Sequence, residues 1–248
     1  LDSAQVASWA DTTDLSVGAR LDILDPGERL ALSTTVIRLD ARPSSNPDTI
    51  IELTAATRGS TFIYSPFPQP PPDGVRIGGA PSWRTILDIG VPTVIDGIPD
   101  FCAVVSCPHM LVPGEISYAA LVLTSRATEA AFQPTDSIRL DVRPVLNRSA
   151  MPKSPLGVSL IVNPFGRAVE PEAFGAAPGV EIEIPFTGYA RDRLRGTDTS
   201  GNPTPETLAL LSVIEPFSIA FASFEGPLSA AEPYLRLVLT IGPPVELP

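Results

Sequence analysis

The chain has 248 residues, enough for one large β domain or two smaller ones, and either size buries a hydrophobic core. Its formal charge of −11 and its single lysine, Lys153, argue against a nucleic-acid partner and against docking on anionic lipid headgroups. The 29 prolines disfavour long helices, and no apolar run reaches the roughly 20 residues that span a bilayer. We therefore expect short strands joined by fixed loops, with no transmembrane segment in this chain.

The N-terminal residues LDSAQVASWADTTD, at 1–14, form a polar stretch that predicts an extended leader. The chain starts at Leu1 rather than at Met, and a removed signal peptide or a lipidated cysteine just before Leu1 would leave such a start. This favours an exported protein, periplasmic or on the cell surface, and leaves a lipid anchor open. Trp9 lies in the leader, where an indole packs either against the edge of the domain or against another protein.

Apolar and polar residues alternate with a period of two, which is typical of strands with one buried and one solvated face. The clearest cases are SIRLDVRPV at 137–145, VEIEIPF at 180–186 and YLRLVLTI at 234–241. The alternation places Asp141, Glu181 and Glu183 on solvated faces. Less regular candidates are 29–39, 49–55, 83–91, 116–124, 156–162, 207–213 and 217–224.

Loops rich in proline and glycine separate these segments, and the longest turn signals are SPFPQPPPDG at 65–74 and GTDTSGNPTPE at 196–206. About ten short strands with such connections predict an all-β, antiparallel, jelly-roll-like sandwich. We expect a single domain over 15–242 and a C-terminal tail at 243–248. The alternative is that the 65–74 loop divides two domains.

One short helix is predicted near 188–195, within TGYARDRLRG. Tyr189, Ala190 and Leu194 are expected to face inward.

Three segments in this order resemble a known family. APSWRTILDIGVP at 80–92 is similar to the "S-x-R-T-L-L-x-F-D-L" strand of DNRLRE-type β-sandwich domains of secreted bacterial proteins, and ISYAALVLTSRA at 116–127 to the strand that follows it there. The region from 180 to 240 resembles the later strand, short helix and closing strands. Ile89 and Gly90 depart from the pattern, and the segment 94–115 is much longer than the usual link. The resemblance implies a jelly-roll-like fold in a secreted or surface protein, and some relatives bind polysaccharides.

Both cysteines and the one histidine lie in that long segment, as FCAVVSCPHM. Cys102, Cys107 and His109 offer two sulfurs and an imidazole, which is less than the tetrahedral set of a structural zinc site, and the spacing is not the C-x-x-C of redox dithiols. We predict a disulfide between Cys102 and Cys107, with free thiols or a metal or redox pair as alternatives, and no cofactor. His109 is expected to be a loop residue with a hydrogen bond or a solvent contact, because no G-x-S-x-G motif accompanies it.

Paired carboxylates are the remaining route to catalysis, since glycoside cleavage needs two of them about 5–10 Å apart. The candidates are Asp88, Asp96, Asp100, Glu181, Glu183 and Glu225. Calcium is the other possibility, at 96–100 or 192–202, although neither stretch has the EF-hand pattern and both are typical of ordinary turns. We expect no enzyme and no metal.

Tyr64, Phe67 and the surrounding prolines form a rigid, partly apolar loop, which suits protein contact because a fixed loop loses little entropy on binding. With Trp9 these residues are the predicted partner contacts. The hypothesis is a non-catalytic exported accessory protein that packs on a larger envelope or membrane-protein assembly. The alternatives are a carbohydrate-binding module of a surface protein and, more weakly supported, an enzyme acting on polysaccharide.

Overall fold

The computed structural model describes residues 36–56, 69–70, 72–79, 82–163, 165–213, 215 and 218–242. By its internal contacts the chain divides into two units, Leu1–Thr57 and Arg58–Pro248, and each is described by itself. This division falls inside the range 15–242 that was predicted as one domain. The following predictions lie outside the described residues: the leader 1–14, the tail 243–248, and the contacts Trp9, Tyr64 and Phe67.

In the first unit, β1 (Val36–Ala41) pairs with β2 (Ile51–Ala56) as an antiparallel hairpin. Both strands overlap predicted segments, 29–39 and 49–55. The ladder runs from Val36 opposite Ala56 to Ala41 opposite Ile51. Within the described residues this hairpin forms a two-stranded sheet of its own.

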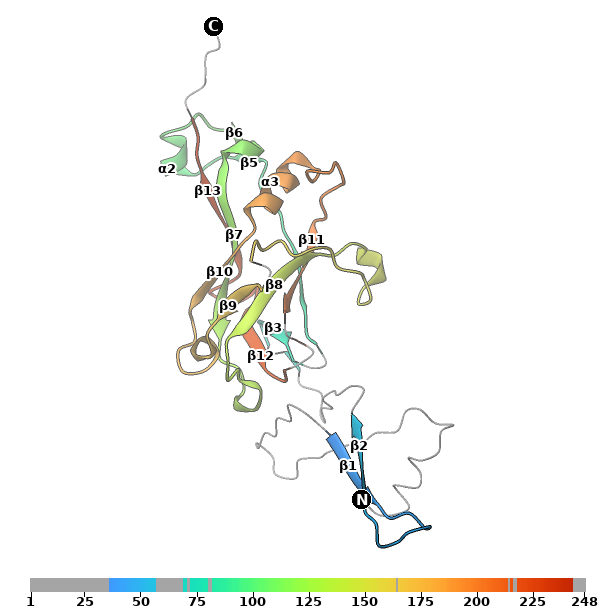
Figure 1. Ribbon diagram of the computed structural model, residues 1–248. Helices are drawn as coiled ribbons and strands as arrows, with labels where there is room; N and C mark the ends of the chain where they lie inside the picture. The colour runs from blue at the N-terminus through green and yellow to red at the C-terminus, as the bar shows by residue number, and fades with distance from the viewer. Residues whose placement is uncertain are drawn as a thin grey trace. The chain divides into compact units, whose positions relative to one another are not determined.

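The second unit contains two larger antiparallel sheets (Figure 1). The first consists of β3 (Gly74–Gly78), β7 (Ile116–Arg126), β10 (Glu181–Pro185), β12 (Phe221–Glu225) and β13 (Tyr234–Leu239). Its long strand β7 pairs with β10, β12 and β13, and β12 pairs with β3. The second has the order β4 (Thr85–Asp88), β11 (Thr207–Ser212), β8 (Ile138–Pro144) and β9 (Arg167–Val169).

The remaining elements are short. A two-stranded sheet pairs β5 (Val94–Ile95) with β6 (His109–Met110). The helices are α2 (Pro99–Cys102), α3 (Thr187–Arg195) and the 3-10 turns η1 (Pro113–Glu115), η2 (Ala130–Phe132), η3 (Arg148–Ala150) and η4 (Pro171–Phe174).

The core lies between the two larger sheets, because each turns an apolar face toward the other. The first sheet contributes Leu121 and Leu123, and the second contributes Leu140 and Leu208, all almost fully buried. This arrangement confirms the predicted all-β antiparallel sandwich.

The predicted short helix is also confirmed, as α3. It ends at Gly196, whose positive φ of 84° is a conformation that glycine adopts without steric cost. Tyr189 and Ala190 are buried, and Leu194 packs against the core, as expected.

The strand predicted at 156–162 does not form. The segment runs beside β8 but makes an isolated bridge between Leu156 and Val145 and a separate backbone bond from Leu160 to Val142 instead of a regular ladder. Val158 and Val162 are exposed on it.

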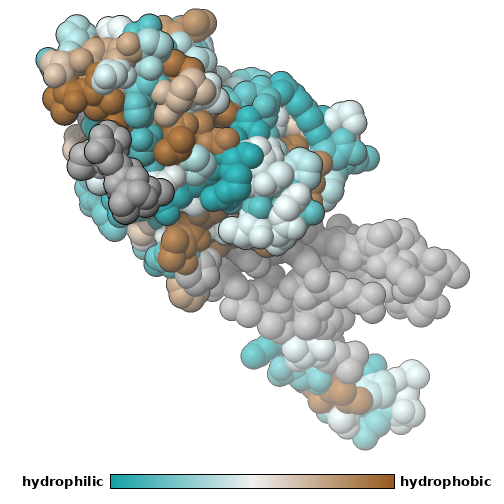
Figure 2. Space-filling model, turned by 90° about the horizontal axis from the view of Figure 1, so that it is seen from above, coloured by the Kyte–Doolittle hydropathy of each residue, from teal (hydrophilic) through white to brown (hydrophobic). Residues whose placement is uncertain are grey.

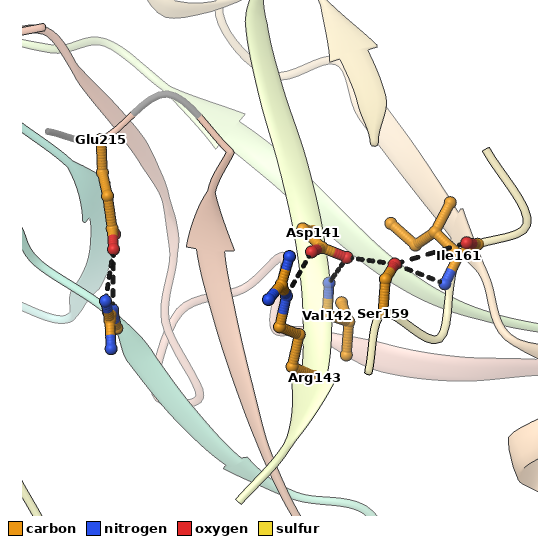
Figure 3. Close-up of polar contacts among 7 residues, drawn as sticks. Asp141, Val142, Arg143, Ser159, Ile161 and Glu215 are labelled. Atoms are coloured by element: carbon orange, nitrogen blue, oxygen red, sulfur yellow. Dashed lines mark hydrogen bonds and ion pairs between the residues drawn. The ribbon is translucent and has the colours of Figure 1, made fainter. Parts of the chain in front are cut away.

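The solvated position predicted for Asp141 is wrong, because this carboxylate is buried (Figure 3). Ser159 donates its hydroxyl to Asp141 at 2.6 Å, the Arg143 Nε–H donates at 2.6 Å, and the Val142 backbone N–H donates at 2.8 Å. The neighbouring segment therefore covers a position that alternation alone assigns to solvent.

Candidate functional site

The long segment between β4 and β7, residues 94–115, is called the insertion below. It holds β5, α2, β6 and η1 and is closed by a disulfide between Cys102 and Cys107, whose Cα atoms are 5.4 Å apart. The predicted disulfide is therefore confirmed. Proline at the first position of α2 starts the turn, and the Cys102 N–H donates to the carbonyl of Ile98.

The carboxylate of Asp96 lies beside this bridge, with one oxygen and both sulfurs within 4.8 Å of one another. The two sulfurs are bonded to each other, so neither provides the thiolate that a metal ion binds. The arrangement as it stands is a disulfide next to a carboxylate and not a ligand set.

The side chain of His109, in β6, contacts Glu115, in η1. Its Nε2 atom is 3.0 Å from an Oε atom of Glu115, and its ring meets the edge of Phe101 at 5.7 Å between centroids. Glu115 also accepts the backbone N–H of Val112 at 3.0 Å. Burial would raise the pKa of Glu115, but the hydrogen bonds from Val112 and His109 outweigh it and lower that pKa below its ordinary value. The predicted hydrogen bond of His109 is confirmed, but the predicted loop position is wrong, because His109 pairs with Ile95 in the short β5–β6 sheet.

Alternation in the small β5–β6 sheet sorts the apolar residues of the insertion. Ile95 and Leu111 are buried against the core, whereas Val94 and Met110 are opposite each other in the ladder and face outward. Val112 lies two residues after Met110 and is exposed as well.

These three side chains, together with Ile98 and Val104, form what we call the insertion surface. Their exposed fractions range from 41% for Val94 to 85% for Val104. Figure 2 shows hydrophobic surface on the end of the unit that carries α2, β5 and β6 in Figure 1. This surface was not predicted from the sequence, because Met110, Leu111 and Val112 are all apolar and their pattern does not show which of them face outward.

The structure brings together one predicted pair of carboxylates, Glu181 and Glu183, on the outer face of β10. Arg236 of β13 reaches across β7 and pairs with both. Tyr118 donates to Glu183 at 2.8 Å, and Tyr234 donates to Glu181 at 3.1 Å. The solvated face predicted for both glutamates is confirmed. Arg236 bridges the two carboxylates, where glycoside cleavage needs a sugar or a water.

This polar network covers the middle of the sheet. Ala120 and Val122 point to the same outer face of β7 and are nevertheless fully buried. An open hollow of about 400 Å³ lies at its side, lined by Tyr118, Arg167, Glu181, Glu183 and Pro185.

Outside the insertion, the predicted carboxylates Asp88 and Glu225 each lie beside an arginine. Asp88 accepts a hydrogen bond from the Thr207 hydroxyl at 2.7 Å and forms an ion pair with Arg148 at 2.9 Å. The hydrogen bond from Thr207 is the main cause that lowers the pKa of Asp88. Glu225 lies 3.8 Å from Arg126.

In the segment 192–202, which was considered for calcium, the carboxylates bind other groups of the same segment. Asp198 accepts the backbone N–H groups of Ser200 and Asn202, and the bonds from Asn202 lead in lowering its pKa. Asp192 pairs with Arg195. These contacts are of the kind that ordinary turns make.

Comparison with known proteins gives no match: neither a family model, nor a curated protein, nor a solved structure matches the chain. The resemblance to DNRLRE-type domains stays a prediction. In the part of the chain that the structure describes, no helix is both long and apolar enough to cross a membrane.

Proposed function

We propose that this is a non-catalytic, exported accessory protein that packs on a larger envelope assembly through the insertion surface. The observation that carries the proposal is a group of apolar side chains facing outward on a loop that a disulfide and the His109–Glu115 contact hold in place. A contiguous apolar patch exposed on a folded protein is characteristic of a site where another molecule binds.

The construction of the insertion supports a binding role. The bridge between Cys102 and Cys107 and the backbone bonds of α2 fix the loop before any partner arrives, so binding orders little additional chain. A disulfide also suits an oxidising compartment, which supports export. The predicted contacts Trp9, Tyr64 and Phe67 belong to the same proposal as further points of attachment.

The proposal is tested by the native mass of the chain in gently solubilised cell envelopes, measured by size-exclusion chromatography with mass detection. We expect a mass well above the 26.2 kDa of the chain, with co-eluting partner chains. A Val104→Ser, Met110→Ser variant should leave the complex. The matched control is Val158→Ser, Val162→Ser, which changes two strongly exposed apolar residues elsewhere and should remain in it. A wild-type monomer would contradict the proposal.

A second candidate is carbohydrate binding on the outer face of the β10–β7–β13 sheet. It rests on Tyr118 and Tyr234, two rings beside Glu181, Glu183 and Arg236, because sugar sites combine flat rings with charged hydrogen-bonding groups. A glycan array with the wild type and a Tyr118→Ala, Tyr234→Ala variant tests it. Binding that the variant loses supports this function, and an array without binding removes it.

A further inference from the structure

The charged residues of the chain segment that carries the insertion surface are all acidic. No lysine or arginine occurs from Thr85 to Ser125, whereas four carboxylates do: Asp88, Asp96, Asp100 and Glu115. Asp88 is paired with Arg148, and Glu115 contacts His109.

The other two carboxylates, Asp96 and Asp100, are exposed and make no ion pair within the described part of the chain. Arg191 of α3 reaches the end of the insertion, but its Nε–H donates to the carbonyl of Ile116. The surface therefore presents uncompensated negative charge to a partner.

These two carboxylates alternate along the chain with apolar residues of the insertion surface. Asp96 follows β5 two residues after Val94, and Asp100 lies in α2 between Ile98 and Val104. A molecule that covers the apolar side chains also approaches both carboxylates. An uncharged partner would remove water from them without replacing it, at a cost in binding free energy.

We propose that the occupant of the insertion surface is a basic, apolar polypeptide segment, in which Lys or Arg residues alternate with hydrophobic ones. This inference rests on the proposed function and adds the chemistry of the partner. The apolar residues supply the binding free energy, and the cations pair with Asp96 and Asp100 and select the partner.

The same charges disfavour the two other occupants of an exposed apolar surface. An anionic bilayer repels both carboxylates. A second copy of this chain, docked through the same surface, would place Asp96 and Asp100 of one copy against those of the other.

The test is binding of the full-length chain to a fluorescent amphipathic peptide of leucine and lysine at helical spacing, followed by anisotropy. The comparison peptide carries glutamate at every lysine position. We expect saturable binding of the lysine peptide that weakens with salt, and binding of the glutamate peptide that is at least about tenfold weaker.

Three variants locate the site. Val94→Ser, Met110→Ser should weaken binding of the lysine peptide by about tenfold or more, because apolar contact is lost. Asp96→Asn, Asp100→Asn should weaken it roughly threefold or more and flatten its dependence on salt. Val158→Ser, Val162→Ser is the control and should leave it unchanged.

Equal binding of the two peptides, an equal loss in the control variant, or the absence of binding overturns the inference. So does recruitment of the chain to phosphatidylglycerol vesicles, or self-association that Met110→Ser abolishes. A large native mass combined with any of these results leaves the proposed function standing and removes only the assigned chemistry of the partner.

Discussion

The outer face of β7 and the outer face of the β5–β6 sheet both carry apolar side chains. Neighbouring side chains cover those of β7, whereas those of the β5–β6 sheet are exposed to solvent. Val122 of β7 is fully buried, and Arg236 and Tyr234, from the neighbouring β13, reach across that face to the glutamates of β10. Met110 of β6 also lies on the outer face of its sheet, and its side chain is 66% exposed. A strand with a neighbour on each side receives long side chains from both, and a two-stranded sheet does not. Apolar residues left bare in this way are available to a partner.

The same substitution on the two surfaces gives the largest expected difference. Val122→Ala should lower the free energy of unfolding by about 2.5 kcal/mol, because it removes fully buried methyl groups and leaves a cavity. Val104→Ala, at an exposed position of the insertion surface, should change it by less than about 0.5 kcal/mol. Urea unfolding measures both, and equal effects would show that the two surfaces do not differ in burial.

Removing the disulfide should affect the insertion more than the sandwich. Cys102→Ser, Cys107→Ser opens a short loop and should cost at most about 2 kcal/mol by the chain-entropy relation. We expect one cooperative unfolding transition and faster amide hydrogen exchange confined to the insertion. Global unfolding of the variant under native conditions would mean that the bridge holds the whole fold.

Exposing the apolar residues on the outer face of β7 should have a smaller effect on the free energy of unfolding. Arg236→Ala removes the ion pairs with Glu181 and Glu183 and the cover over Val122, and should lower the free energy of unfolding by about 1 kcal/mol. It should also increase binding of a hydrophobic dye to the sheet. An unchanged unfolding midpoint and unchanged dye binding would show that Arg236 does not cover the apolar residues.

The smallest effect concerns the anchoring of the insertion by Glu115. The pKa of this group is lowered in the folded state, so its contribution to stability is complete above its ordinary pKa of 4.5 and is lost as the pH falls through the folded value. Glu115→Gln does not titrate and should lose less stability than the wild type over that interval. Urea unfolding at neutral pH and at a series of values below 4.5 measures the difference, and identical pH profiles would exclude this role.

Alternation predicted most of the sandwich because it reports which face of a strand meets the core. It located β7, β8, β10, β11 and β13, and the short helix predicted within TGYARDRLRG is α3. It failed at β3, where glycines and the buried Arg76 interrupt the pattern. It also failed at Asp141, since a segment distant in sequence supplies the hydrogen bonds that allow a carboxylate to be buried.

The candidate site was predicted only in part. The cysteine spacing indicated the disulfide, and the absence of a G-x-S-x-G motif indicated a hydrogen bond or a solvent contact for His109 rather than catalysis. The outward position of Val94 and Met110 depends on the pairing of two short strands on either side of the bridge, and pairing between segments is not encoded in local pattern. The cover over Val122 depends in the same way on which strands flank β7.

The central claim is that a partner covers the insertion surface in the native envelope. Methionine oxidation tests it most directly, because the chain has two methionines and they lie in different places. Met110 belongs to the insertion surface, whereas Met151 is a partly exposed residue after η3. Brief treatment with hydrogen peroxide, followed by mass spectrometry, should oxidise both in the isolated chain. In the native envelope extract we expect Met110 to be protected and Met151 to react as before. Equal oxidation of Met110 in the two preparations would contradict the account, because the insertion surface would then be uncovered in its native setting.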